Sequence, residues 1–422
     1  MPQNQFRIVV GSYEHNLLCL SLNLSLESPI FTPIFHFQAH ALSVKCLDIS
    51  KRYLVSGSND EHIRIYDLQK RKELGNLMSH QGSITALRFS RGTKVVSKAE
   101  GEEIAEPLGR GNSKWLLSAS DDHNLVVWRV KDWENFGTLK GHLARINDFD
   151  IHPSNRIAIS VSEDHSIRLW NLMTIKKAGV LKLKKYNQNG QFVRWCGDNG
   201  EFFAVALTNK VLIYRTSTAK VHREIDTGKS SIMHMEIEMI DDQEHIVVGF
   251  GNGVVSMYST NELYSKKDEE EEDKGDEEDE EDEEDEDEED EKKEAPISPV
   301  FTLQGHSNRI KDFKFYTNEF GHYLVTISSD GKIVVWDMAT KDQVAVYDCA
   351  ERLNCLALCD ETIEKYETMK KRDAEEAELG EQSEVEEDSE NLKQIMLGSK
   401  PLKKGKNKKS GSKNKKVDIQ LE

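Results

Sequence analysis

Short runs of alternating apolar and polar residues recur along roughly the first 360 residues, and polar turns separate neighbouring runs. Four stretches are especially alike: a run that ends in serine, a turn that contains aspartate, and a second run with an aromatic residue six positions after that aspartate. Period-two alternation bounded by such turns predicts β-hairpins. The copies are Ser58, Asp60 and Tyr66; Ser120, Asp122 and Trp128; Ser162, Asp164 and Trp170; and Ser328, Asp330 and Trp336.

A histidine precedes each copy, at His40, His80, His142 and His306. Its imidazole can contact the turn aspartate, and we expect the serine hydroxyl to bridge to the aromatic residue of the next strand. These residue types also occur in hydrolytic triads, but an active site occurs once and this set occurs four times. We therefore interpret it as a repeated structural tetrad.

The aromatic residues set a period close to forty residues. They stand at positions 66, 128, 170, 214, 258 and 336, and the copies that end at Tyr214 and Tyr258 have lost most of the motif. Two intervals are too long for one period, and each contains an obvious insertion, at about 91–114 and about 265–296. We predict that both insertions are loops that leave their repeat units intact.

The two ends of the chain hold the remaining strands. Residues 7–12, 17–20 and 31–37 predict three strands without a first partner, and residues 353–358 predict one strand more. Pairing these would close a ring and leave no free sheet edge. A period near forty with Gly-His and Trp-Asp signatures resembles the WD40-repeat family, whose fold is a β-propeller. We thus expect an all-β WD40 propeller over 1–360, with seven four-stranded blades closed by N- and C-terminal strands.

Charge is concentrated outside the predicted ring. The chain has a formal charge of −19, whereas residues 268–291 alone hold 22 acids and one lysine, a charge of −21. The insertion at 265–296 is therefore polyacidic. It could be a solvated spacer or a polyanion that binds basic proteins, and both interpretations remain open.

The C-terminal part differs in character from the ring. Residues 361–397 are highly charged and predict an exposed helical extension, and residues 398–422 are rich in lysine and predict a disordered tail. Such a tail is typical of a nuclear address and of phosphate binding in RNA. Its candidate lysines are Lys403, Lys404, Lys406, Lys408, Lys409, Lys413, Lys415 and Lys416.

Several classes of chemistry lack support in the sequence. The six cysteines form no CxxC pair, and three of them, Cys349, Cys355 and Cys359, have no histidine at zinc-ligand spacing. No apolar run approaches the length of a membrane span. We predict no catalytic residue, no cofactor, no metal and no membrane contact.

Arg145 and Arg309 are candidate partner-binding residues. Each stands three positions after the histidine of a Gly-His pair, where the chain enters a predicted blade. They should share one face of the ring, and propellers commonly bind partners on such a face. An internal ion pair with Asp148, Asp312 or the acidic loop is an equally good interpretation.

At closer range the chain resembles the family of the p21-activated-kinase-interacting protein and its fungal maintenance-of-killer counterpart. The resemblance lies in a propeller that begins near residue 1, in the segments 56–67 and 119–128, and in the lysine-rich end. It implies a noncatalytic nucleolar factor for assembly of the large (60S) ribosomal subunit. The expected partners are proteins and rRNA of the precursor particles, which the protein would join as a monomer. The alternatives are an adaptor that binds a p21-activated protein kinase and a histone-binding chromatin factor.

Overall fold

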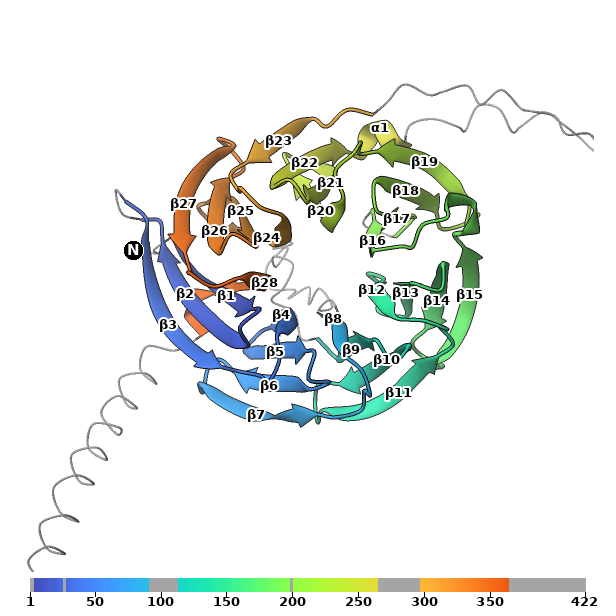
Figure 1. Ribbon diagram of the computed structural model, residues 1–422, viewed down its shortest axis with the longest axis horizontal. Helices are drawn as coiled ribbons and strands as arrows, with labels where there is room; N and C mark the ends of the chain where they lie inside the picture. Colours follow the sequence, from blue (N-terminus) through green and yellow to red (C-terminus); the bar gives the residue numbers. More distant parts are fainter. Residues whose placement is uncertain (1–3, 26–27, 91–112, 198–199, 265–296, 364–422) are drawn as a thin grey trace, which may run out of the picture. The chain divides into compact units, whose positions relative to one another are not determined.

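The computed structural model describes residues 4–25, 28–90, 113–197, 200–264 and 297–363, and every structural statement below refers to these residues. They form seven four-stranded sheets arranged as the blades of a ring (Figure 1). The paired strands are antiparallel throughout each sheet, as in β1 with β2. The helical elements are short: η1 (Lys184–Tyr186), α1 (Asn261–Tyr264) and η2 (Glu361–Ile363).

Blades 2 to 7 follow the order of the chain, and in each the innermost strand comes first. Blade 2 is β4 (Val44–Ser50), β5 (Tyr53–Ser58), β6 (Ile63–Asp67) and β7 (Lys72–Leu77), and blade 3 is β8 (Ile84–Phe89), β9 (Trp115–Ser120), β10 (Asn124–Arg129) and β11 (Glu134–Lys140). Blade 4 is β12 (Ile146–Ile151), β13 (Ile157–Ser162), β14 (Ser166–Asn171) and β15 (Lys176–Lys182), and blade 5 is β16 (Phe192–Cys196), β17 (Phe202–Ala206), β18 (Lys210–Arg215) and β19 (Val221–Asp226). Blade 6 is β20 (Ile232–Ile240), β21 (Gln243–Phe250), β22 (Val254–Ser259) and β23 (Phe301–Gln304), and blade 7 is β24 (Ile310–Asn318), β25 (Gly321–Ser328), β26 (Lys332–Asp337) and β27 (Asp342–Asp348).

Blade 1 joins the two ends of the described chain. It consists of β28 (Leu353–Asp360), β1 (Gln5–Ser12), β2 (Asn16–Asn23) and β3 (Ile30–Gln38), in that order. β28 pairs antiparallel with β1, and Ala357 lies opposite Val9. The predicted closure and the count of seven blades are therefore confirmed.

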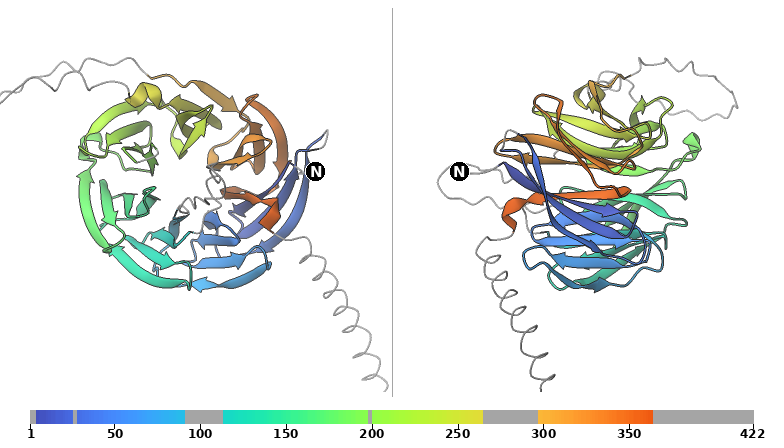
Figure 2. Two further views of the ribbon diagram at one scale, coloured as in Figure 1. Left: turned by 180° about the vertical axis from the view of Figure 1, so that it is seen from behind. Right: turned by 60° about the vertical axis from the view of Figure 1, so that its left-hand side comes forward.

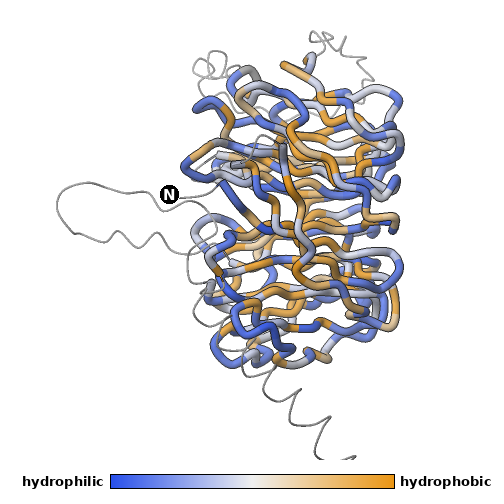
Figure 3. The backbone as a smooth tube through the Cα atoms, turned by 90° about the vertical axis from the view of Figure 1, so that its left-hand side faces the viewer, coloured by the Kyte–Doolittle hydropathy of each residue, from blue (hydrophilic) through white to orange (hydrophobic). Residues whose placement is uncertain are grey.

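The core lies between the blades, because each sheet is covered on both sides by its neighbours. Apolar residues occupy the strands, while polar residues concentrate in the loops at both ends (Figure 3). Trp170, Phe149 and Leu17 are fully buried in this way. Contact between blades is close: a Cβ on Gly57 of blade 2 would lie 2.6 Å from Cγ2 of Ile84 in blade 3, so glycine permits the approach.

Two faces of the ring carry different loops (Figure 2). We call the face that bears the four tetrad histidines and their aspartate turns the histidine face. The other, the opposite face, is the one at which the first and third strands of each blade end. The described chain breaks off after Ser90, Tyr264 and Ile363. These residues follow β8, β22 and β28, three strands that end at the opposite face.

Some predicted segments fall largely outside the described residues. Of the insertion at 91–114, only Ser113 and Lys114 are described, and none of the acidic insertion at 265–296 is. Of the predicted extension at 361–397, only η2 is described, and the tail at 398–422 lies wholly outside. The candidate lysines of the tail therefore remain a prediction.

Candidate binding surfaces of the ring

The tetrad histidines lie against the turn aspartates of the same blade. Their Nδ1 atoms are 3.0 Å from Asp60, 2.9 Å from Asp122, 2.9 Å from Asp164 and 3.2 Å from Asp330. Each histidine thereby ties the loop that enters the blade to the turn between the second and third strands. The same aspartates also accept backbone amides, as Asp164 does from Leu143 and Ser166.

The predicted bridging hydroxyl was wrong in all four copies. Ser58, Ser120, Ser162 and Ser328 instead accept the backbone amide of the turn aspartate, and the first three also donate to a loop carbonyl. The residue two positions earlier contacts histidine Nε2, at 2.7 to 2.9 Å: Ser56, Ser118, Ser160 and Thr326. Three of these hydroxyls also accept from tryptophan Nε1, of Trp128, Trp170 and Trp336.

Strand register explains the difference. Trp170 lies directly opposite Ala158, so Ser160 is its diagonal neighbour on the same face. Ser162 stands four residues from Ala158, or roughly 13 Å along a strand, which is beyond the reach of the indole. The sequence offered two hydroxyls on one face, and the pairing selects the earlier one.

Burial governs the protonation of the tetrads. It lowers the pKa of His40, His142 and His306, although their aspartate partners oppose the effect. Burial alone would raise the pKa of Asp164, but hydrogen bonds from the Ser166 hydroxyl, the Leu143 amide and His142 bring it down to about 2. The tetrad is thus most stable with a neutral imidazole and an ionised carboxylate.

Arg145 and Arg309 share the histidine face, as predicted from their spacing. Their carbonyl oxygens accept the amides of Glu163 and Ser329 at corresponding places in blades 4 and 7. Their side chains differ, because Arg145 Nε lies 3.1 Å from a carboxylate oxygen of Asp121. Arg309 makes no ion pair with any described residue. The alternative partners Asp148 and Asp312 contact Arg194 and His234 instead.

Arg309 belongs to a group of cations from three neighbouring blades. Arg352 occupies the corresponding loop position in blade 1, where its carbonyl accepts the amide of Tyr13. Lys45 of β4 and Lys311 of β24 line the channel below, in a cavity of about 250 Å³. We call Lys45, Arg309, Lys311 and Arg352 the mouth cations.

Deeper in the channel, the innermost strands contribute charges of alternating sign. Strand register places six residues of the innermost strands at one level around the channel. In each blade the second strand has one residue that pairs with the blade aromatic, and the charged residue lies opposite the next residue of that strand. From blade 2 to blade 7 they are Asp48, Arg88, Asp150, Arg194, Glu236 and Lys314, and blade 1 places Ala357 there. We call these six residues the charge ring. The charge ring was not predicted from the sequence, because its residues alternate in sign and so do not look like a repeat.

Glu236 is the hub of the charge ring. It lies 2.9 Å from Nε of Arg194, 2.5 Å from Nζ of Lys314 and 3.6 Å from Nη2 of Arg88. Burial would raise the pKa of Glu236, but these three cations hold it well below the usual value. Arg88 comes from blade 3, so its guanidinium spans the channel and ties together blades that are not neighbours in the ring.

Carboxylates near the channel also accept hydrogen bonds from backbone amides on the unpaired strand edge of the next blade. Asp48 accepts the amide of Phe89 at 2.6 Å, Asp150 that of Trp195 at 2.9 Å, and Asp312 that of Leu356 at 2.8 Å. The last contact runs from blade 7 to blade 1 and therefore spans the closure of the ring. Edge amides of the innermost strands, which no strand pairs, find acceptors in this way.

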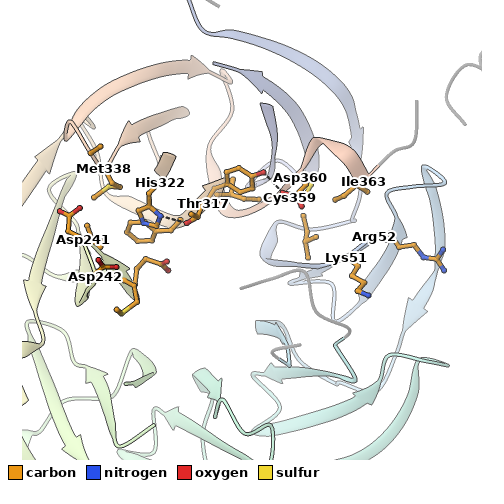
Figure 4. Close-up of a pocket in the computed structure, with 18 of the residues that line it drawn as sticks. Lys51, Arg52, Asp241, Asp242, Thr317, His322, Met338, Cys359, Asp360 and Ile363 are labelled. Atoms are coloured by element: carbon orange, nitrogen blue, oxygen red, sulfur yellow. Dashed lines mark hydrogen bonds between the residues drawn. The ribbon is translucent and has the colours of Figure 1, made fainter. Parts of the chain in front are cut away.

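The opposite face contains a larger pocket, of about 860 Å³ (Figure 4). Its wall is mixed, with apolar side chains such as Met338 and Ile363 beside polar ones. Thr317 Oγ1 lies 2.6 Å from Nδ1 of His322, whose pKa is lowered by burial. Burial also raises the pKa of the Cys359 thiol well above its usual value, so this cysteine is not the thiolate that nucleophilic catalysis requires.

The described residues contain neither a metal centre nor a membrane-spanning helix. No cluster of three or more histidine, cysteine or acidic side chains is arranged to hold a metal ion. No helix in the described segments has the length and apolar character needed to cross a bilayer.

Comparison with known proteins places the repeats in a wider context. The WD domain, G-beta repeat model matches residues 31–67, 133–171 and 297–337. Each match begins at or just before the outermost strand of one blade and ends with the third strand of the next, so the sequence repeat and the blade are offset by one strand. This offset is the reason that the chain ends must share blade 1.

Relatives align over most or all of the chain. Protein MAK11 of Saccharomyces cerevisiae is 62% identical over 100% of this chain and 99% of its own length. A p21-activated protein kinase-interacting protein 1-like protein of Gallus gallus is 29% identical over 83% of this chain and 79% of its own length. The p21-activated protein kinase-interacting protein 1 of Homo sapiens is 26% identical, over 83% and 76% respectively.

The tetrads generate a prediction about stability. Asp164→Ala removes the acceptor of a buried histidine, a hydroxyl and two amides, and should lower the free energy of unfolding by about 2 to 4 kcal/mol. Asp342→Ala is the matched control, because that side chain is exposed at the start of β27. Urea denaturation of both variants measures the difference. Equal midpoints would contradict the role given to the tetrad.

A second prediction concerns pH. The pKa of His40, His142 and His306 is lower in the folded chain, so the unfolded chain takes up protons first as the pH falls below about 6.5. Stability should therefore be full above that pH and decline towards about pH 5, with a further loss below about pH 4 as Asp164 is protonated in the unfolded chain.

Thermal unfolding at several pH values tests this dependence. The melting temperature should fall less steeply with decreasing pH in His142→Gln, because this variant lacks one of the three histidines whose pKa is lowered. A melting temperature that stays constant between about pH 7.5 and 5 would refute the assignment of neutral imidazoles.

Proposed function

The chain belongs to the family of WD-repeat proteins that contains Protein MAK11 and the p21-activated kinase-interacting proteins, and from that premise we propose that it is a noncatalytic scaffold in assembly of the large (60S) ribosomal subunit. In this role the propeller docks on nucleolar precursor particles through the histidine face. One copy joins proteins and rRNA of the particle.

The observation that carries the proposal is the asymmetry of the histidine face. Arg309 and Arg352 are exposed at corresponding loops of neighbouring blades, and neither forms an ion pair with a described residue. Unpaired arginines on a rigid scaffold are suited to charge-assisted hydrogen bonds with phosphate or carboxylate groups. An rRNA phosphate or an acidic protein surface would supply those groups.

The lysine-rich end supports a ribosomal particle as the destination. The alignment with the yeast relative extends over the whole chain, whereas that with the Gallus gallus relative covers 83% of it. We propose that Lys403 to Lys416 direct the protein to the nucleus and nucleolus and add affinity for RNA. The acidic insertion would then hold basic proteins of the same particle.

A second candidate function rests on the names of other relatives. Several are called p21-activated protein kinase-interacting proteins, and one from Schizosaccharomyces pombe is called Shk1 kinase-binding protein 15. An adaptor that binds a p21-activated kinase would use the same kind of rigid protein-binding face. Particle association distinguishes this function from the first.

Gradient sedimentation of a tagged chain from cells tests the proposal. Wild-type protein should sediment with precursor large-subunit rRNA. Arg309→Glu should lower the affinity for the particle at least about tenfold, because repulsion replaces a charge-assisted hydrogen bond. The particle-bound fraction should fall accordingly. Arg145→Glu is the matched control, since it makes the same substitution at the corresponding loop of blade 4, where Asp121 already pairs the arginine.

Three outcomes are informative. Release by Arg309→Glu alone supports docking through the mouth of the channel, provided that the variant melts like the wild type. Retention of both variants on particles would move the docking surface elsewhere. Wild-type protein found only in light fractions, together with a kinase, would favour the adaptor.

A further inference from the structure

The mouth cations crowd together without a counter-charge among the described residues. Burial lowers the pKa of Lys311, and the charges of Arg309, Lys45 and Arg352 lower it further. The four side chains come from blades 7, 1 and 2, and none forms an ion pair with a described residue. Such crowding is unfavourable in the free protein, and an anion bound among the four would relieve it.

The nearest carboxylates are engaged by other partners. Asp312 accepts the amide of Leu356 and contacts His234, and Glu351 accepts from Asn16 and His36. The turn carboxylates of Asp60 and Asp330 are held by their tetrad histidines. No carboxylate of the described segments therefore compensates the charge of the mouth cations.

The basic surface is compact rather than extended. At the channel level of Lys45 and Lys311, blades 3 to 6 place uncharged residues: Thr85, Asn147, Gln191 and Met233. At the loop level of Arg309 and Arg352, blades 2, 3 and 6 place Ser43, Ser83 and Ser231. Blade 4 places Arg145 there, and its charge is paired by Asp121. Nucleic-acid backbones are bound along a basic stripe or groove, and at these two levels the cations without an ion pair to a described residue are confined to three blades.

Exposed apolar side chains border the same three blades. Tyr13 is 53% exposed and donates its amide to the carbonyl of Arg352, so it lies beside that loop. Leu42 is 48% exposed and stands three residues before Lys45. A ligand with one concentrated negative charge and flanking side chains matches this surface better than a single free ion does.

We propose that the mouth cations bind the phosphate of a phosphorylated serine or threonine in a segment of a partner protein, with Tyr13 and Leu42 contacting the residues that flank it. A phosphomonoester carries close to two negative charges and three acceptor oxygens, so it can engage several cations at once. This assignment rests on the proposed function only in taking the ring to be a protein-binding scaffold. It adds that the docking is controlled by phosphorylation of the partner.

Fluorescence anisotropy with the purified full-length chain tests the site. The probe is a peptide library with one fixed phosphoserine between degenerate positions, compared with the same library carrying serine or glutamate at that position. The phosphorylated library should bind at least about tenfold more tightly than either. Lys45→Gln with Lys311→Gln should abolish that preference, while Lys140→Gln with Lys176→Gln, two exposed lysines on outer strands, should preserve it.

A second measurement does not depend on the variants folding. An amine-reactive label on wild-type protein, mapped by mass spectrometry, should modify Lys311 and Lys45 less when the phosphorylated library is present, while Lys140 stays unchanged. Equal binding of the phosphorylated and serine libraries, without this protection, would overturn the proposal. The proposal would also be overturned if a single-stranded RNA bound more tightly than the phosphorylated library and the Lys45 and Lys311 double variant lost that binding, since the site would then be one for RNA. Because these assays use no particles, they can fail while sedimentation succeeds, and the reverse also holds.

Discussion

The charge ring and the carboxylates beside it hold the blades at their positions around the channel. The innermost strand of each blade has one edge that no strand pairs, and its amides need acceptors away from bulk water. Asp48, Asp150 and Asp312 supply them across blade boundaries. The acidic residues are neutralised by Arg88, Arg194 and Lys314, and all three cations form ion pairs with Glu236. A buried ionic network of this kind is favourable only because nearly every member has several partners.

An odd number of blades sets a limit on such a network. Strict alternation of sign cannot close around seven positions, and blade 1 resolves the conflict by placing the small apolar Ala357 at the charge-ring level. This is the blade built from both ends of the chain. Its β28 is held by Asp312 from one side and by Asn354, which donates to the carbonyl of Val44, on the other. The mouth cations stand above this junction, so their spacing depends on how blades 7, 1 and 2 are fixed below.

Much of the fold could be predicted from the sequence, because hairpin alternation and the histidine, aspartate and aromatic positions are local signals. The closure by residues 353–358 followed from counting strands. The tetrad hydroxyl was misassigned, since Ser160 and Ser162 lie on one strand face and only the pairing of Trp170 with Ala158 separates them. Arg145 and Arg309 appeared equivalent in sequence, and only the structure shows that Asp121 pairs one of them. The charge ring did carry a signal in five of its six blades, an offset of four residues from the start of the first strand, as in Val44 to Asp48 and Ile84 to Arg88. Blade 5 departs from it, because β16 begins at Phe192, two residues before Arg194.

The central claim is that the charge ring couples the blades energetically, and a double-mutant cycle between Arg194 and Glu236 tests it most directly. The variants are Arg194→Met, Glu236→Gln and their combination, with the free energy of unfolding taken from urea denaturation. The account predicts that each single variant is strongly destabilised and that the double variant is less so than the sum, with a coupling of about 1.5 to 3 kcal/mol. Losses that add to within about 0.5 kcal/mol would show that the two residues act independently and would contradict the account.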